Sequence, residues 1–409
     1  MNYPDVTPKE IDYLLSPIAI RERCQKIFEL SLSGKGAFNI HLDKLDDVSG
    51  YVLSVIKDNY PSLDIPFHSR WGHFQTGGID RLKSLNEKLK GCSKYERVRA
   101  KLDLVLISVL LDAGAGNEWG YVEPSSGHIY ARSEGLAIAS FDMFLAGVFS
   151  NDKSNPLKVD AQALIEFSIE KLKIGFQVTD KNPLAGVEGR VNLLRSLGKV
   201  LTQNNSFFKA QRPGSLFDYL VEQHGKHLQA EHILAGVLNG FSDIWPGRVS
   251  INRVNMGDVW QYTFLQSEEA LSSLVPFHKL SQWLTYSLIE PIVEAGVEVS
   301  GVEKLTGLAE YRNGGLLIDK QLIELKDKTL FDQSHLASSD LIIEWRALTI
   351  ILLDKIGDKI RDSLNMSKNE LPLAKVLEGG TWWAGRKAAK ELRANGEPPL
   401  KLKSDGTVF

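Results

Sequence analysis

The chain has few cysteines, little net charge and no long apolar run, and each shortage argues against a class of protein. Its two cysteines, Cys24 and Cys92, match no metal-binding or redox spacing, which is typical of a protein in a reducing compartment. A formal net charge of −3 argues against a nucleic-acid partner, because phosphate contacts need a basic surface. The longest nearly apolar run, Leu102 to Leu111, contains Asp103 and is about half as long as a membrane span.

The start of the chain has no basic segment followed by an apolar run, so a secretory signal is not expected either. We therefore expect a cytoplasmic protein without a membrane or nucleic-acid partner. The sequence does not indicate an oligomeric state.

Strand-like alternation is also scarce, whereas helical periodicity recurs along the whole chain. Two or three short strands are possible within 121–130 or 249–254, but the repeated strand–helix pattern of a parallel sheet is absent. We predict a mostly α, multi-helical fold. Residues 1–409 then form a single large helical unit, or two closely packed helical lobes with the pocket between them. The predicted helices are 11–30, 43–56, 97–111, 134–148, 161–172, 190–201, 230–240, 279–289, 340–356 and 384–392.

The segment that follows Pro276 is predicted to be a helix with a lysine in its first turn. Leu280, Trp283 and Leu284 lie on one helical stripe, and Lys279 lies on an adjacent one. Pro276 and Pro291 are interpreted as marking the start and the stop of this helix. A cation in a first turn is disfavoured by the helix dipole by up to about 1 kcal/mol, so a carboxylate, a substrate phosphate or simple exposure should compensate it.

About thirty residues downstream of Lys279, Glu310, Tyr311 and Arg312 place a carboxylate, a phenol and a guanidinium side by side. Together with Lys279 they are the best active-site candidates in the chain. For either motif alone, the more ordinary alternative is a solvated Lys279 and a surface ion pair between Glu310 and Arg312.

A third candidate lies where an almost wholly apolar helix ends at Asp112 and a glycine-rich loop follows. The helix dipole repels a negative charge at this end, so Asp112 is expected to have a partner or a ligand. Glu118 could supply a hydrogen-bonding edge and Trp119 a stacking face. A helix end followed by an ordinary turn is an equal alternative for the loop.

Three further groups of polar residues could contribute to a site. Glu344 and Arg346 interrupt a segment that is apolar on nearly every face, so both need partners from elsewhere, and we expect an ion network around Arg312. His68, Arg70 and His73 lie in a segment predicted to be a loop that could grip a ribose or phosphate, although such loops are more often packed corners. The histidines His224, His227 and His232 have no strong metal signature, and no metal or cofactor is expected.

Several strings resemble, nearly from end to end, the uracil-catabolism protein four family, a group of domains of unknown function encoded with uracil-degrading enzymes. The matching strings are Ile65-Pro66-Phe67-His68-Ser69-Arg70-Trp71, Arg132-Ser133-Glu134-Gly135-Leu136-Ala137, Asn182-Pro183-Leu184, Ile244-Trp245-Pro246-Gly247-Arg248, Glu378-Gly379-Gly380-Thr381-Trp382-Trp383-Ala384-Gly385-Arg386 and Ser404-Asp405-Gly406-Thr407-Val408-Phe409.

A more distant similarity is to the queuosine salvage nucleosidases, which have a helix-hairpin-helix, DNA-glycosylase-like fold and release a base from a ribonucleoside or its 5′-phosphate. The family's Lys-Arg-Ala-Gln matches 279–282, its Ala-Asp-Tyr-Arg-Val-Pro-Gln matches 309–315, its Glu-Ile-Arg-Ala matches 344–347, and its Leu-Asp-Ala-Leu-Asn-Phe-Cys-Phe-Trp matches 111–119. In this chain glutamate replaces the aspartate and Asn313-Gly314-Gly315 replaces Val-Pro-Gln. A small, planar, polar leaving group therefore fits better than a large deazaguanine.

The resemblance implies an N-ribosyl hydrolase of uracil degradation that cleaves N-ribosylurea or its 5′-phosphate to urea and ribose or ribose phosphate. It implies that Glu310 and Lys279 are catalytic and that Glu344 and Arg346 support them. A phosphate would be bound by Arg70, Arg312 or Arg386, whereas Trp382 and Trp383 remain unassigned. The predicted substrate-binding residues are Asp112, Glu118, Trp119, His68, Arg70, His73, Gln282, Tyr311, Arg312 and Asn313. The alternatives are a uracil phosphoribosyltransferase-like enzyme and a non-catalytic binding protein of the pathway.

Overall fold

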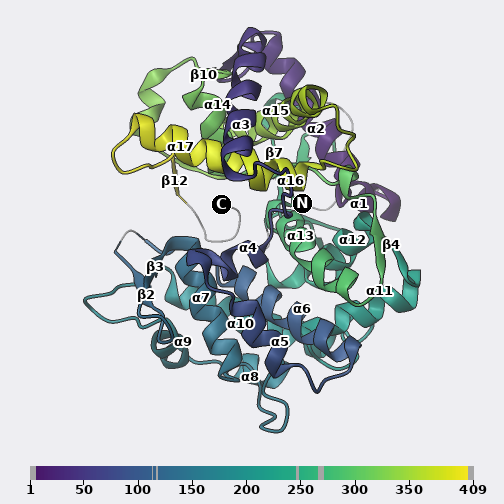
Figure 1. Ribbon diagram of the computed structural model, residues 1–409. Coiled ribbons are helices and arrows are strands. Elements are labelled where there is room, and N and C mark those ends of the chain that lie inside the picture. The colour runs from purple at the N-terminus through teal and green to yellow at the C-terminus, as the bar shows by residue number, and fades with distance from the viewer. Residues whose placement is uncertain (1–5, 113, 117, 246–247, 266–270, 404–409) are drawn as a thin grey trace. The chain divides into compact units, whose positions relative to one another are not determined.

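Helices make up most of the chain, as Figure 1 shows, so the predicted mostly α fold is confirmed. The computed structural model describes residues 6–112, 114–116, 118–245, 248–265 and 271–403. Parts of the glycine-rich loop, of the Trp-Pro-Gly-Arg string and the terminal 404–409 string lie outside the described residues. Within these ranges, no helix is long and apolar enough to cross a membrane. The helix-hairpin-helix arrangement stays a prediction.

The chain divides into two compact units, each built from segments that are distant in sequence. Unit 1 comprises Met1–His68, Gly247–Trp283 and Gly301–Phe409, and unit 2 comprises Ser69–Pro246 and Leu284–Ser300. The boundary passes through helix α13 (Lys279–Glu294), so its first turn belongs to unit 1 and the remainder to unit 2.

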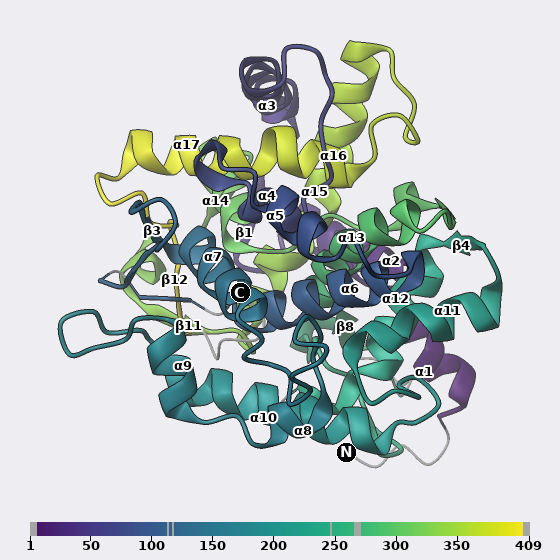
Figure 2. The ribbon, with the colours of Figure 1, turned by 60° about the horizontal axis from the view of Figure 1, so that its bottom comes forward.

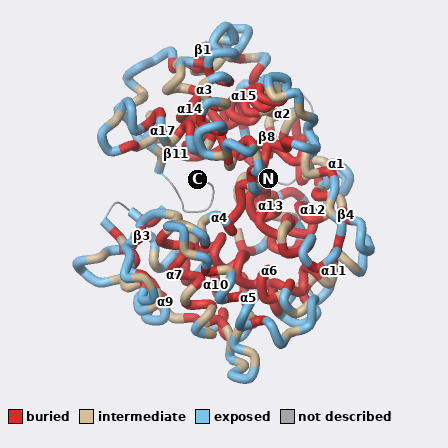
Figure 3. Tube along the Cα trace, in the orientation of Figure 1, coloured by how far each residue is buried: buried red, intermediate tan, exposed pale blue. Residues whose placement is uncertain are grey.

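Unit 1 is organised around one long helix, α15, whose apolar sequence gives it a nearly continuous buried surface (Figure 3). Helices α2 and α3 pack against α15, and α17 packs against α14. The close approach of α17 depends on Gly385, because a β-carbon there would collide with the carbonyl oxygen of Arg312. The helices and strands of unit 1 besides α13 are α1 (Pro8–Leu14), α2 (Pro17–Leu32), β1 (Phe38–Ile40), η1 (Leu42–Lys44), α3 (Leu45–Asn59), β5 (Ser250–Ile251), β6 (Val254–Asn255), β7 (Val259–Gln261), η5 (Thr263–Leu265), β8 (Leu274–Pro276), η6 (Val302–Lys304), α14 (Tyr311–Asp319), β10 (Ile323–Leu325), η7 (Lys328–Asp332), β11 (Ser334–Leu336), α15 (Asp340–Leu364), α16 (Leu373–Val376), η8 (Leu377–Thr381), α17 (Trp382–Leu392) and β12 (Lys401–Lys403).

Unit 2 is organised around α6, a largely buried helix that packs against α7, while α8 packs on α10 (Figure 2). The strands are short and pair two by two in both units. Tyr121 pairs with Tyr130 in an antiparallel hairpin, so the strands predicted at 121–130 are confirmed. The helices and strands of unit 2 besides α13 are α4 (Arg70–Phe74), η2 (Thr76–Gly78), α5 (Arg81–Lys88), α6 (Lys94–Leu110), β2 (Gly120–Val122), β3 (Ile129–Ala131), α7 (Arg132–Leu145), α8 (Ala161–Ile165), α9 (Ile169–Gly175), α10 (Val187–Gln203), η3 (Pro213–Ser215), α11 (Leu216–His224), β4 (His227–Gln229), α12 (Ala230–Gly240), η4 (Ser242–Ile244) and β9 (Glu298–Ser300).

The prediction that Pro291 stops its helix is wrong, because α13 continues to Glu294 with the proline inside it. Proline has no N–H to donate to the carbonyl of the residue four positions earlier, which here is Ser287. The indole N–H of Trp71 donates to that carbonyl oxygen at 2.8 Å instead. A side chain remote in sequence thus satisfies the group that the proline leaves open.

Two predicted helices are each divided in the structure. The segment 11–30 is split between α1 and α2, where Ser16 caps the second helix and Pro17 occupies its first position. The segment 161–172 is split between α8 and α9, where Ser168 accepts a hydrogen bond from the backbone N–H of Lys171. The segment at 68–73 that was predicted to be a loop contains the short helix α4.

Candidate functional site

The first turn of α13 is held by an aspartate that lies far upstream in the chain. Asp258 accepts a hydrogen bond from the backbone N–H of Lys279 at 2.9 Å and so satisfies one of the open donors of the helix start. His278, just before the helix, has a left-handed backbone with φ of 48°, a conformation that is costly for a residue with a β-carbon. Strain of this kind often accompanies a functional position.

Asp258 also forms a bidentate ion pair with Arg346, with the two guanidinium nitrogens at 2.8 and 2.7 Å from its oxygens. Both side chains are almost fully buried. Burial would raise the pKa of Asp258, but Arg346 and the donated hydrogen bonds of Trp260 and Lys279 hold that pKa below its ordinary value. The predicted need of Arg346 for a distant partner is confirmed, but the partner is Asp258 and not the expected network around Arg312.

Arg346 connects this pair to Glu310, because its Nε donates to the carbonyl oxygen of Ala309 at 3.3 Å. Glu310 caps α14: its two carboxylate oxygens accept the backbone N–H groups of Arg312 and Asn313 at 2.7 and 2.6 Å. The helix N-terminus carries partial positive charge, which favours a carboxylate there. Glu310 and the first turn of α13 are therefore linked through Arg346 and Asp258 within unit 1.

Two amide side chains predicted to bind substrate have unsatisfied polar atoms in the interior of unit 1. Gln282 is fully buried, and among the described residues neither its Oε1 nor its Nε2 has a hydrogen-bond partner. Asn313 is also fully buried; its Nδ2 donates to Leu308, but its Oδ1 has no described partner. An unsatisfied buried polar group costs about 1–3 kcal/mol, so such groups are rare without a reason.

A histidine–glutamate pair lies against tryptophans beside this turn. His68 Nδ1 is 2.7 Å from Glu378 Oε2, and both side chains are mostly buried. The His68 ring centroid is 6.4 Å from that of Trp283 and 5.8 Å from that of Trp382. Trp283 follows Gln282 on α13, and the Lys279 ammonium is 6.0 Å from the Trp283 ring. The two groups of polar side chains therefore share the first turn of α13.

The other predicted residues of unit 1 mainly hold the fold together. Arg312 is buried, donates to the carbonyl oxygen of Gly396 at 2.7 Å and lies over the Tyr311 ring. Glu344 accepts hydrogen bonds from the Ser31 hydroxyl and from the backbone N–H groups of Ala37 and Phe38. The expected ion network around Arg312 is thus wrong for Glu344 as well, because its partners are neutral donors.

The glycine that replaces proline of the nucleosidase motif has a packing role. A β-carbon at Gly314 would lie 2.7 Å from the Trp345 indole, so only glycine lets α14 lie this close to α15. The same contact includes a hydrogen bond from Trp345 Nε1 to the Gly314 carbonyl oxygen at 3.0 Å.

In unit 2, Arg70 and Asp112 form an ion pair with each other. Arg70 is fully buried and lies 3.2 Å from Asp112, and it also donates to both the hydroxyl and the carbonyl oxygen of Ser108. Asp112 further accepts the Ser133 hydroxyl at 2.7 Å. The prediction that Asp112 has a partner is confirmed. Arg190 donates to the carbonyl oxygen of Leu111 at 2.9 Å and secures the same helix end.

The remaining predicted residues of unit 2 differ in exposure. Trp119 is 1% exposed and donates its indole N–H to the Phe176 carbonyl oxygen at 2.9 Å, so its ring packs in the core. Glu118 is exposed, and His73 lies partly buried on α4. Binding of substrate by these residues stays a prediction.

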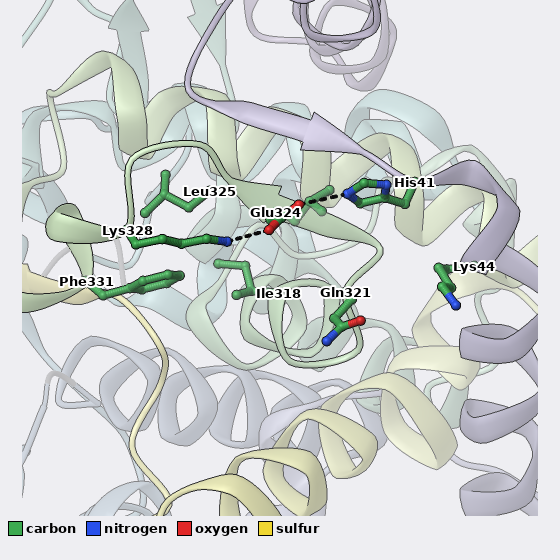
Figure 4. A pocket seen from close by; sticks show the side chains of 9 residues that line it. His41, Lys44, Ile318, Gln321, Glu324, Leu325, Lys328 and Phe331 are labelled. Atoms are coloured by element: carbon green, nitrogen blue, oxygen red, sulfur yellow. Dashed lines mark hydrogen bonds and ion pairs between the residues drawn. The ribbon is translucent and has the colours of Figure 1, made fainter.

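Figure 4 shows a described cavity of unit 1 that contains none of the predicted residues. It has a volume of about 380 Å³, and Phe331 and Ile318 line it together with polar groups. Glu324 in its wall is 2.6 Å from the Lys328 ammonium and 3.2 Å from His41 Nε2. These side chains are well exposed and already paired.

Several residues of the site could not be found by inspecting the sequence. Asp258 and Glu378 lie outside the helical patterns that drew attention to Lys279 and Arg346, and nothing in a single chain indicates their contacts. For Glu378 two signals were available: it lies in one of the strings that carry the family resemblance, and two tryptophans of that string offer large flat surfaces to a pocket.

The fold and the site define a mostly α protein with a buried polar cluster that has open hydrogen-bonding groups. The chain belongs to the family described as "Protein of unknown function (DUF1688)", whose model matches residues 13–409. It is similar to "Protein urg3" of Schizosaccharomyces pombe, with 40% identity over 404 residues that cover 97% of this chain and 98% of the relative. It is also similar to "Uracil catabolism protein 4" of Lachancea kluyveri, with 37% identity over 98% of this chain and 99% of the relative.

Proposed function

We propose that the chain acts in uracil catabolism as an N-ribosyl hydrolase that cleaves N-ribosylurea or its 5′-phosphate to urea and ribose or ribose phosphate. The name of the relative from Lachancea kluyveri supports the pathway. The observation that carries the reaction is the Gln282 amide, which is fully buried and has no hydrogen-bond partner for either polar atom among the described residues.

Urea and a glutamine side chain are complementary, because each presents a carbonyl oxygen beside an N–H group. Two parallel hydrogen bonds can therefore form between them, one in each direction. Such a pair gives both Oε1 and Nε2 of Gln282 a hydrogen-bond partner and offsets the free-energy cost of their desolvation. The open Oδ1 of Asn313 offers one further acceptor for an N–H or a sugar hydroxyl.

Glu310 is the proposed catalytic carboxylate. Breaking an N-ribosyl bond builds positive charge on the sugar, which a nearby carboxylate stabilises while it orients the attacking water. Its two N–H bonds to the start of α14 fix the orientation of the carboxylate, and each oxygen keeps a second lone pair for water or substrate. Lys279 supplies a cation near the leaving group or the sugar hydroxyls.

The test is urea release by the purified chain from N-ribosylurea and from its 5′-phosphate. We expect Glu310→Gln to lower turnover roughly 100- to 1,000-fold. Its melting temperature should fall modestly, because the amide can accept only one of the two backbone N–H bonds, so turnover is compared at a temperature at which both proteins are folded. Glu324→Gln, in an exposed carboxylate of the same unit, serves as the matched control and should leave turnover unchanged. Wild-type turnover in Glu310→Gln would remove Glu310 from the reaction.

Lys279→Met separates a catalytic from a structural role of the lysine. We expect it to lose turnover and keep its melting temperature, because the hydrogen bond to Asp258 comes from the backbone of Lys279 and survives the substitution. A lower melting temperature with normal turnover would make Lys279 structural. Tight binding of the ribosyl compound by the wild-type chain without any urea release would indicate a binding protein.

A further inference from the structure

The pairs that His41, His68 and His227 form with a glutamate differ in burial, and the His68 pair is the buried one among them. The side chains of His41 and Glu324 are 39% and 44% exposed, and those of His227 and Glu298 are 83% and 70% exposed. Those of His68 and Glu378 are only 7% and 15% exposed. Since exposed pairs contribute little to stability, and buried charged or polar pairs are costly to maintain, the His68–Glu378 pair calls for a separate explanation.

The backbone around Glu378 is specialised as well. Glu378 lies in η8, a π-helical turn that joins α16 to α17, and such turns are frequent at functional sites. Gly380 lets this turn pack closely on α3, because a β-carbon there would lie 2.7 Å from Val52. Glu378 and Trp382, four residues apart, can share a helix face, and both contact His68.

Glu378 fixes the orientation of the imidazole. A carboxylate can only accept a hydrogen bond, so His68 Nδ1 carries the proton of the 2.7 Å contact. Nε2 then points away from Glu378 and has no hydrogen bond with a described residue. The Tyr60 hydroxyl donates to the other carboxylate oxygen at 3.4 Å, and burial together with Glu378 raises the pKa of Tyr60 to about 12, so Tyr60 keeps its proton.

Two tryptophan rings lie beside His68, and a basic side chain lies near each ring. Trp283 and Trp382 supply flat faces, and they are accompanied by the Lys279 ammonium at 6.0 Å from the first ring and the Arg386 guanidinium at 5.2 Å from the second. A planar leaving group can lie on such faces. Gln282, the proposed partner of urea, immediately precedes Trp283 in the chain.

We propose that His68, oriented by Glu378, is the proton donor to the departing nitrogen. This assignment rests on the function proposed above. The leaving group of N-ribosylurea is a strongly basic nitrogen, so its departure is slow unless it is protonated as the bond breaks. His68 thus acts as the general acid on the leaving nitrogen, while Glu310 accepts the proton from the attacking water.

The donor is His68 in its doubly protonated form, with one proton on Nδ1 toward Glu378 and the other on Nε2. The bond between the anomeric carbon and nitrogen breaks, and its electron pair stays on nitrogen. That nitrogen takes the Nε2 proton and leaves as neutral urea, so His68 becomes neutral and keeps its Nδ1 proton. The oxygen of water bonds to the anomeric carbon, and the released proton passes to Glu310. Solvent returns that proton from Glu310 to His68, so the sum is addition of one water.

The test compares two substrates that differ in their need for an acid: N-ribosylurea, and p-nitrophenyl riboside, whose leaving group departs without protonation. His68→Asn keeps a donor to Glu378 and removes Nε2. We expect it to lose roughly 100- to 10,000-fold in kcat/KM on N-ribosylurea and to remain near wild type on the nitrophenyl substrate. His41→Asn, in the exposed pair of Figure 4, is the matched control and should change neither substrate.

The possible outcomes separate this assignment from the proposed function. Glu310→Gln should lose activity on both substrates, since both reactions build the same charge on the sugar. If His68→Asn loses both substrates equally, or neither, His68 is not the proton donor, although the hydrolase function stands. If the wild-type chain releases no urea, the proposed function fails and the proton-donor assignment fails with it.

Discussion

The polar groups at the first turn of α13 in unit 1 and those at the end of α6 in unit 2 have similar compositions but opposite states of satisfaction. In unit 2, Arg70 and Asp112 meet each other, and neighbouring serines accept or donate the remaining hydrogen bonds. In unit 1, Gln282 is completely buried, and no residue in the described part of the chain forms a hydrogen bond with its amide atoms. Both groups drew attention in the sequence for the same reason, namely polar residues beside apolar helices.

The difference shows how a structural cluster and a binding cluster can be distinguished. In a saturated network, hydrogen bonds within the protein offset the desolvation of every polar group, so a ligand adds no stability there. An open buried amide costs stability in the free protein and recovers it when a partner arrives. Removing a residue of a saturated pair should therefore lower the free energy of unfolding, whereas removing the unpaired amide of Gln282 should raise it.

The largest expected effect is in the saturated cluster. Arg70→Met leaves the Asp112 carboxylate without its cation, which should lower the free energy of unfolding by about 3–5 kcal/mol. Denaturant melts measure this loss, and the KM of the folded protein for N-ribosylurea in the proposed reaction should not change. A raised KM with unaltered stability would instead assign Arg70 to substrate binding, as first expected from the sequence.

Asp258→Asn should lower the free energy of unfolding by about 3 kcal/mol, because it leaves Arg346 buried without its counter-charge. The pKa of Asp258 is held below its ordinary value of 3.8, so its contribution is fully present above about pH 3.8 and is lost as the pH falls through the folded-state pKa. Melts at pH 7, 5, 4 and 3 should show the gap between wild type and variant narrowing only at the acid end. A gap that is constant with pH would contradict the ion pair.

Gln282→Met should change stability in the other direction. Removing the two open amide atoms is expected to raise the free energy of unfolding by about 1–3 kcal/mol while weakening substrate binding. The exposed Gln321, replaced by methionine in the same way, is the control and should change neither quantity. If Gln282→Met destabilises the protein, the amide is satisfied in solution and the comparison between the clusters fails.

The smallest effect concerns the proline inside α13. Trp71→Phe removes the hydrogen bond to the Ser287 carbonyl oxygen and should cost about 1 kcal/mol. Combining it with Pro291→Ala restores a backbone donor for that oxygen, so the loss should shrink in the double variant. Equal losses with and without Pro291 would show that the two residues are not coupled.

Most of the fold could be predicted because helical periodicity is a local property. The segment 230–240 is a helix with the predicted bounds, and the hairpin at 121–130 was visible as a possible pair of strands. The continuation of α13 past Pro291 could not be predicted, because the group that allows it, Trp71, lies 216 residues away in the chain.

The site was predictable only in part, for the same reason. Lys279, Glu310 and Arg346 stand out as charged residues beside apolar helices. Asp258 connects Lys279 with Arg346, but no local sequence pattern marks it. The sequence therefore suggested an ion network around Arg312 instead. Open hydrogen-bonding atoms such as those of Gln282 can be recognised only once every neighbour has a position.

The most direct measurement is a crystal structure of the chain soaked with N-ribosylurea or its 5′-phosphate. We expect the urea group to pair with the Gln282 amide and the anomeric carbon to lie beside the Glu310 carboxylate. Ligand density against Asp112 and Glu118 instead, with Gln282 still unpaired, would contradict it.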